Sequence, residues 1–386
     1  MNDVTFPENG STALTIDPER RAKGQEHGRT RRQWLAVELG VSLLLILAFW
    51  LTGGSRWLKA LLVNAGLNHP WLLVGSYVAL CFVGFTLLLE PLSWWQGYIL
   101  PHRYDLSTQT LRGWLLDELK GLALGLALGV PVAEVIYWLL RSQPETWWLW
   151  AAGFLILFGV LLDMLAPVLL VPLFYTLTPL EDAALVARIQ QLGNRAKTPV
   201  VGVYTIDLSR RTKAANALVM GLGKTKRIAL GDTLYEAYTP AEIEGILAHE
   251  LAHQVHHDLE LGIVAQSALI LSGLYLAHLL LHWGVARYGF AGPADVAALP
   301  LFILAMALFS LFTMPLTNAY SRWRERLADR FAAYLIDNPR VLANALVRLS
   351  NQNLADPDPP QWVVWLLHTH PPIKQRIEDV MGEQGS

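Results

Sequence analysis

The chain has 386 residues, of which 53% are hydrophobic and only 16% are charged. Soluble domains usually carry about 25% charged residues, so this composition indicates membrane spans. The net charge of −2 predicts no nucleic-acid partner, because such partners require a basic surface. The only cysteine, Cys81, excludes a disulfide framework within the chain.

The first 33 residues are polar and end in a cluster of lysines and arginines. This stretch is long for the positively charged start of a signal peptide, and no small-residue cleavage site follows the next apolar segment. We therefore predict a disordered basic tail over residues 1–33, ahead of an uncleaved membrane anchor.

Six apolar segments are long enough to cross a hydrocarbon core of about 30 Å, which takes about 20 helical residues. They lie near residues 34–52, 71–93, 118–140, 147–169, 260–283 and 297–317. The predicted fold is therefore mainly α: a polytopic membrane protein with about six transmembrane helices. Four of these helices fall within residues 34–175, and the last two form a pair within residues 259–317.

The basic residues predict the orientation of these helices. If the chain starts on the cytoplasmic side, the outer loops hold only Arg56, Lys59, Arg141 and Arg287, and the cytoplasmic segments hold the remaining 26 of the 30 lysines and arginines. The positive-inside rule then places both termini in the cytoplasm. For a bacterial protein the membrane would be the plasma (inner) membrane.

The fifth span contains two histidines, His278 and His282, four residues apart. Ionisable groups at such a depth usually face the interior of a helix bundle or a wet cavity. The pair could hold a metal ion. Because no carboxylate stands beside it in the sequence, lining of a cavity is the favoured interpretation.

Residues 176–258 are more polar and predict a small domain on the cytoplasmic side. An amphipathic helix is expected over residues 180–196 and a β-strand over residues 200–208, which are rich in β-branched side chains. Two further short strands, over residues 214–220 and 227–230, flank a glycine-containing turn and predict a hairpin. The expected β structure is thus a small sheet or hairpin.

The sequence His249-Glu250-Leu251-Ala252-His253 matches the H-E-x-x-H pattern. Two histidines four apart on a helix share a face, so both imidazoles can bind one zinc ion. Glu250 would then lie beside the ion, where it can act as the base for a zinc-activated water. Thr239 and Glu242 form a predicted capping box that starts this helix.

Catalytic zinc needs a third protein ligand. Residues 318–386 form a second protease segment in which Glu325 and Asp329 share one helical face. Alone, such a helix would be a solvated charged surface. Together with the H-E-x-x-H pattern, Glu325 is the predicted third ligand, and Asp329 is predicted to orient a ligand histidine.

The chain resembles the integral-membrane CAAX prenyl protease 1 family and its bacterial relatives over residues 71–380. Four motifs carry this resemblance in order, and the last one leads into a C-terminal helix. The motifs are Asn216-Ala217 with the segment up to Leu234, His249–His253, Ser321-Arg322 through Glu325 to Asp329, and His370-Pro371 with Arg376.

This resemblance implies roles for several of the matched residues. It implies that Asn216 and Ala217 align a peptide substrate, and that His370 and Arg376 contact the reacting group as catalytic and substrate-binding residues. It also implies zinc as the cofactor, a peptide or protein substrate and contact with membrane lipid. Members of the family enclose a chamber within seven helices, so one helix fewer is expected here.

Three other interpretations remain open from the residues alone. In a site-2-type intramembrane metalloprotease the metal helix lies within the membrane, but here it carries Glu242, Glu244 and Asp258. A membrane scaffold or receptor with structural zinc would normally use four protein ligands. A transporter is favoured only by the ionisable residues within the spans.

Overall fold

Long helices make up most of the structure, a computed structural model that describes residues 16–220 and 226–382. The main helices of the N-terminal half are α1 (Pro18–Leu51), α2 (Gly54–Asn64), α3 (Pro70–Trp94), α4 (Leu100–Arg103), α5 (Leu111–Ser142), α6 (Trp147–Leu165) and α7 (Val171–Phe174). Those of the C-terminal half are α8 (Ala183–Arg195), α9 (Asp232–Tyr235), α10 (Pro240–Val255), α11 (Asp258–Tyr288), α12 (Leu299–Leu335), α13 (Pro339–Gln352), α14 (Gln361–Leu367) and α15 (Ile373–Gly382).

Six helical segments of the described residues are long and apolar enough to cross a membrane, which confirms the predicted number. They are Pro18–Leu51, Pro70–Arg103, Leu111–Ser142, Trp147–Phe174, Asp258–Tyr288 and Val296–Leu335. All are longer than predicted because the helices continue past their apolar stretches. Two of them pass through π-helical turns at Trp95–Ile99 and Ala166–Leu170 before they end.

The predicted disordered tail is wrong for residues 18–33, which form the first half of α1. Asp17 caps this helix by accepting hydrogen bonds from two backbone amides, and Pro18 occupies its first turn, where its missing N–H costs nothing. Gly24 lies so close to the Ala355 carbonyl that a Cβ would meet the oxygen at 2.6 Å. Packing against the C-terminal segment therefore orders this charged stretch, a contact that the local sequence does not reveal.

A four-stranded mixed sheet follows the fourth span. Its strands are β1 (Leu177–Pro179), β2 (Gly202–Ile206), β3 (Ala217–Met220) and β4 (Arg227–Gly231), in the spatial order β1-β2-β4-β3. The predicted hairpin is confirmed, since β3 and β4 pair antiparallel. Its tip, around residues 221–225, lies outside the described residues. The short strand β1, which was not predicted, pairs with β2 and leaves β3 at the opposite edge.

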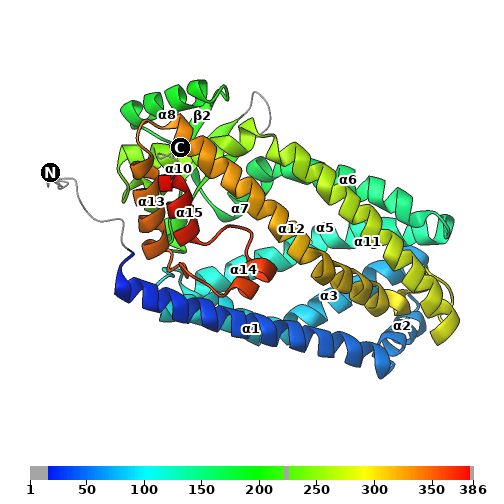
Figure 1. Ribbon diagram of the computed structural model, residues 1–386. Coiled ribbons are helices and arrows are strands. Elements are labelled where there is room, and N and C mark those ends of the chain that lie inside the picture. Colours follow the sequence, from blue (N-terminus) through cyan, green and yellow to red (C-terminus); the bar gives the residue numbers. More distant parts are fainter. Residues whose placement is uncertain (1–15, 221–225, 383–386) are drawn as a thin grey trace.

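The protease elements gather at one end of the bundle of long helices (Figure 1). There α10 buries one apolar stripe, Ile243, Ile246, Leu247 and Leu251, in a core shared with α8, α13 and the sheet. The segment from α8 to α10 and the segment from the end of α12 to α15 thus share one core. Spans α11 and α12 lead the chain away from this end and back to it (Figure 1).

Candidate metal centre

Helix α10, which carries the H-E-x-x-H pattern, begins where the sequence predicts. Thr239 accepts a hydrogen bond from the Glu242 amide at 3.3 Å, and the Glu242 carboxylate accepts one from the Thr239 amide at 2.9 Å. This capping box satisfies amides at the helix start and fixes its first turn. His249 and His253 consequently lie one turn apart on one face, with ring centroids separated by 4.9 Å.

Glu325 on α12 completes a group of three potential metal ligands with these histidines. Nε2 of His249 lies 3.4 Å from Nε2 of His253 and 3.3 Å from a Glu325 oxygen, and the other Glu325 oxygen lies 3.6 Å from His253 Nε2. Ligands bound tetrahedrally at about 2.1 Å are about 3.4 Å apart, so the group fits a zinc ion. The buried Oε2 of Glu325 accepts no hydrogen bond from the described residues, as expected for an atom reserved for a cation.

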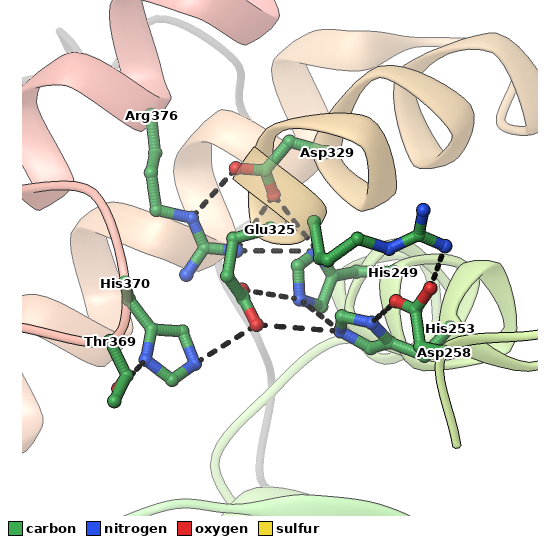
Figure 2. Close-up of polar contacts among 9 residues, drawn as sticks. His249, His253, Asp258, Glu325, Asp329, Thr369, His370 and Arg376 are labelled. Atoms are coloured by element: carbon green, nitrogen blue, oxygen red, sulfur yellow. Dashed lines mark hydrogen bonds and ion pairs between the residues drawn. The ribbon is translucent and has the colours of Figure 1, made fainter. Parts of the chain in front are cut away.

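A buried carboxylate and an arginine support His249 from behind. Oδ1 of Asp329 lies 2.9 Å from His249 Nδ1, which leaves Nε2 pointing at the ligand group. Arg376 on α15 donates to both Asp329 oxygens, at 2.8 and 2.7 Å (Figure 2). Carboxylates in this position fix the tautomer and orientation of a ligand histidine. The two hydrogen bonds to Asp329 indicate a positioning role for Arg376. Because Arg376 also lines the cavity beside His249, its contact with substrate stays a prediction.

His253 is supported in the same way by a residue for which we predicted no role. Its Nδ1 lies 2.6 Å from Oδ2 of Asp258, and Arg324 on α12 donates to the other Asp258 oxygen (Figure 2). Asp258 starts α11 directly after His257, which has left-handed backbone angles (φ 54°). That sharp break turns Asp258 back toward His253, and the helical periodicity of the sequence gives no sign of it.

Glu250 lines a cavity of about 260 Å³ next to the ligand group. Burial raises the pKa of its carboxyl group, although the neighbouring histidine charges oppose this shift. A carboxylate whose pKa moves toward neutrality is suited to accept and return a proton. Glu250 therefore has the location and the proton affinity expected of a general base.

His370 approaches the ligand group from the C-terminal segment. Its Nε2 lies 3.3 Å from a Glu325 oxygen, and its Nδ1 lies 2.8 Å from the Thr369 hydroxyl. When Thr369 donates to Nδ1, Nε2 carries the proton and points into the site as a donor. Thr369 is a second residue for which we predicted no role.

Helix α12 also fixes the backbone that leads to His370. The Asn318 side chain donates to the Leu366 carbonyl at 2.6 Å. Arg322 donates to the carbonyls of Val364 and His368 at 2.7 and 2.6 Å. The helix that supplies Glu325 therefore also positions the segment that carries His370.

The start of strand β3 and the residue before it line the cavity. Asn216 and Ala217 line it together with His249 and Glu250. The Asn216 carbonyl accepts from the Gly231 amide, while its side chain accepts from the Ala217 amide, both at 2.9 Å. Because β3 pairs only with β4 among the described strands, its other edge can accept an additional strand.

Two family profiles together match nearly the whole chain. Residues 179–384 match peptidase family M48, and residues 6–176 match the CAAX prenyl protease N-terminal region, described as five membrane helices. Within that N-terminal match the structure has four candidate spans and the short helix α2.

Curated relatives cover most of the chain as well. An uncharacterized metalloprotease, YhfN of Bacillus subtilis, is 28% identical over 97% of this chain and 88% of its own length. A CAAX prenyl protease 1 homolog of Arabidopsis thaliana is 30% identical over 76% of this chain and 70% of its own length. The two proteins come from a bacterium and a plant, so the similarity extends across distant organisms.

The fold also matches a solved structure. The crystal structure of S. mikatae Ste24p superposes with a TM-score of 0.85 and 23% identity, covering 95% of this chain and 90% of that one. The family matches favour the protease over the site-2-type, scaffold and transporter alternatives. The chain belongs to peptidase family M48 and is a multi-pass membrane metalloendopeptidase of the CAAX prenyl protease type.

Proposed function

We propose that this protein is a zinc metalloendopeptidase in which His249, His253 and Glu325 hold the metal ion. The observation that supports this most strongly is the spacing of 3.3–3.6 Å among the three donor groups. Each histidine also has a carboxylate at Nδ1, which leaves Nε2 for the ion. Two histidines and one glutamate are a known ligand set of catalytic zinc.

The residues around the proposed metal site have separate roles in peptide hydrolysis. Bound zinc would polarise the scissile carbonyl and acidify the attacking water. Glu250 takes the proton from that water and returns it to the leaving amine. His370 donates from Nε2 to the oxygen of the carbonyl as negative charge develops there. Arg376 acts through Asp329 and holds His249 in place.

We further propose that the substrate backbone pairs with the free edge of β3 beside Asn216 and Ala217. Such strand addition binds through main-chain hydrogen bonds, so it depends little on substrate sequence. The adjacent cavity is lined by aliphatic side chains that include Ile246, Leu346 and Leu349, which suits an aliphatic substrate residue. Membrane-associated or C-terminally processed proteins, prenylated ones included, are the substrate class that we propose.

The active site is proposed to face the cytoplasm, and in a bacterium the membrane would be the plasma membrane. The support is the excess of lysine and arginine on the protease side of the spans. Topology reporters fused after Lys59, Glu145 and Phe290 should all report the outer side. A cytoplasmic signal from any of these three fusions would contradict the orientation.

The proposed function is tested by the purified variant Glu250→Gln. Zinc content should remain at the wild-type level, whereas hydrolysis of a quenched fluorescent peptide should fall by at least about 10²–10⁴-fold, the contribution of a general base. Glu244→Gln is the matched control, because Glu244 is on the same helix but pairs with Arg188. Wild-type turnover by Glu250→Gln would disprove the assignment. Comparing the peptide with and without a C-terminal prenyl group tests the substrate class.

A further inference from the structure

A second group of potential metal ligands lies at the end of the bundle away from the protease elements. His278 and His282 are one turn apart on α11, and Glu145 lies in the connector between α5 and α6. One donor atom from each residue lies within 4.8 Å of the other two. A helix rises about 1.5 Å per residue, so His278 is about 30 Å along α11 from Asp258. The two ligand groups therefore cannot share an ion.

The hydrogen bonding of His282 leaves one of its ring nitrogens available for an ion. Its Nδ1 donates to the His278 backbone carbonyl at 2.9 Å, so Nε2 of the neutral ring is an acceptor. This Nε2 lies 3.8 Å from a Glu145 carboxylate oxygen. Two acceptors that face each other repel unless a cation or proton lies between them, and a metal ion meets this requirement.

His278 also has a ring nitrogen without a hydrogen-bond partner among the described residues. Its ring centroid lies 4.2 Å from that of His282 and 6.2 Å from the stacked ring of Tyr275. Its Nδ1 is buried and has no hydrogen-bond partner among the residues that the structure describes. Leaving a buried polar nitrogen unpaired is costly, so a ligand that satisfies it would stabilise this end of the bundle.

The surroundings of Glu145 make the group accessible from water. Its side chain is 81% exposed, and the partly exposed Trp148 follows it at the start of α6. Tryptophans are typical of the membrane–water interface, which places the connector at that level and not in the hydrocarbon core. An ion can therefore reach the group from solution, and water can complete its coordination.

We propose that Glu145, His278 and His282 form a second metal site that binds a divalent ion favoured by imidazole ligands, such as zinc. Two imidazoles, one carboxylate and a water molecule supply the four positions that zinc prefers. The bound ion would tie the α5–α6 connector to α11. It would thus strengthen the end of the bundle opposite the protease elements.

The test is the number of zinc ions that each full-length chain binds. Detergent-purified protein is stripped with a chelator, loaded with zinc alone, desalted and measured by elemental analysis. We expect two zinc ions for the wild type and one for His278→Ala/His282→Ala. The reciprocal variant His249→Ala/His253→Ala should keep one ion, and added zinc should still raise its melting temperature.

Two further variants are controls. One tests the second site with a mild change of shape, and the other tests whether removal of any histidine lowers the zinc content. Glu145→Gln changes an exposed side chain with little change in shape, and it should lower occupancy of the second site when zinc is limiting. His69→Ala removes an exposed histidine that immediately precedes α3 and should keep both ions. A wild-type chain whose single zinc is lost in His249→Ala/His253→Ala would overturn the proposal. Two zinc ions retained by His278→Ala/His282→Ala would overturn it as well.

Discussion

Two regions of this protein present the same kinds of donor in very different settings. Each has two histidines four residues apart on one helix and a glutamate from a distant segment. Glu325 of the protease group is 9% exposed, whereas Glu145 of the second group is 81% exposed. The buried glutamate is held in position before an ion arrives, whereas the exposed one must be ordered by it, which costs side-chain entropy.

The two regions also differ in the groups that contact the Nδ1 atoms of their histidines. In the protease group the histidine Nδ1 atoms contact Asp329 and Asp258, whereas in the second group Nδ1 of His282 contacts a backbone carbonyl. Leu279 also follows His278 at the position where Glu250 follows His249. We therefore expect a reactive site only at the group that also has carboxylates behind its histidines and a base beside them, and we expect zinc to bind more weakly at the second site.

The largest effect should come from removing the proposed third catalytic ligand. In Glu325→Ala the catalytic zinc should be lost and peptide hydrolysis should fall to the level of zinc-free protein, because two histidines alone leave the ion poorly held. Elemental analysis and a peptidase assay measure both. Glu145→Ala is the matched change at the second site and should leave hydrolysis at the wild-type level. Full zinc retention by Glu325→Ala would place the ligand elsewhere.

A smaller effect is expected from substitution of Asp329 and Asp258, the carboxylates that contact the two proposed ligand histidines. Asp329→Asn and Asp258→Asn should each lower zinc affinity or activity by about 10–100-fold. Asp329→Asn should be the more harmful, because Asp329 is 2% exposed and Asp258 14% exposed. It also leaves buried Arg376 without its carboxylate, which costs on the order of 3–5 kcal/mol. Zinc titration measures the affinity of each variant, and denaturant unfolding measures its stability. Equal effects of the two substitutions would show that burial of the carboxylate does not determine the loss.

The smallest effect concerns pH. In the metal-free protein, burial and Arg376 disfavour protonation of His249, but Asp329 and Glu325 outweigh them and raise its pKa to about 9. A bound proton then contributes stability that is complete below about pH 6.5 and is lost as the pH rises through about 9. Zinc must displace this proton, so its affinity should increase with pH over that range. Titration calorimetry in buffers of different ionisation enthalpy measures the released proton. Zinc binding without proton release would contradict this.

Features determined by local sequence were predictable. The capping box at Thr239, the pairing of β3 with β4 and the six spans all follow from short-range patterns, and the structure contains them. Glu325 was placed with the histidines because spans five and six return the chain to the same end. That inference needs only topology and a family resemblance.

Features that depend on contacts between distant segments were missed. The partnership of Asp258 with His253 needs the left-handed turn at His257, which the helical periodicity does not reveal. The helical start of α1 depends on packing against Ala355, far along the chain. Likewise, no carboxylate is close to His278 and His282 in the sequence. In the structure Glu145, from the α5–α6 connector, lies beside them.

The proposed mechanism depends on one zinc ion held by His249, His253 and Glu325. An anomalous difference map recorded at the zinc absorption edge from crystals of the full-length protein tests this most directly. We expect a strong peak about 2.0–2.2 Å from Nε2 of both histidines and from a Glu325 oxygen. A map of zinc-loaded protein with no peak there, or with a peak ligated by other residues, would contradict it.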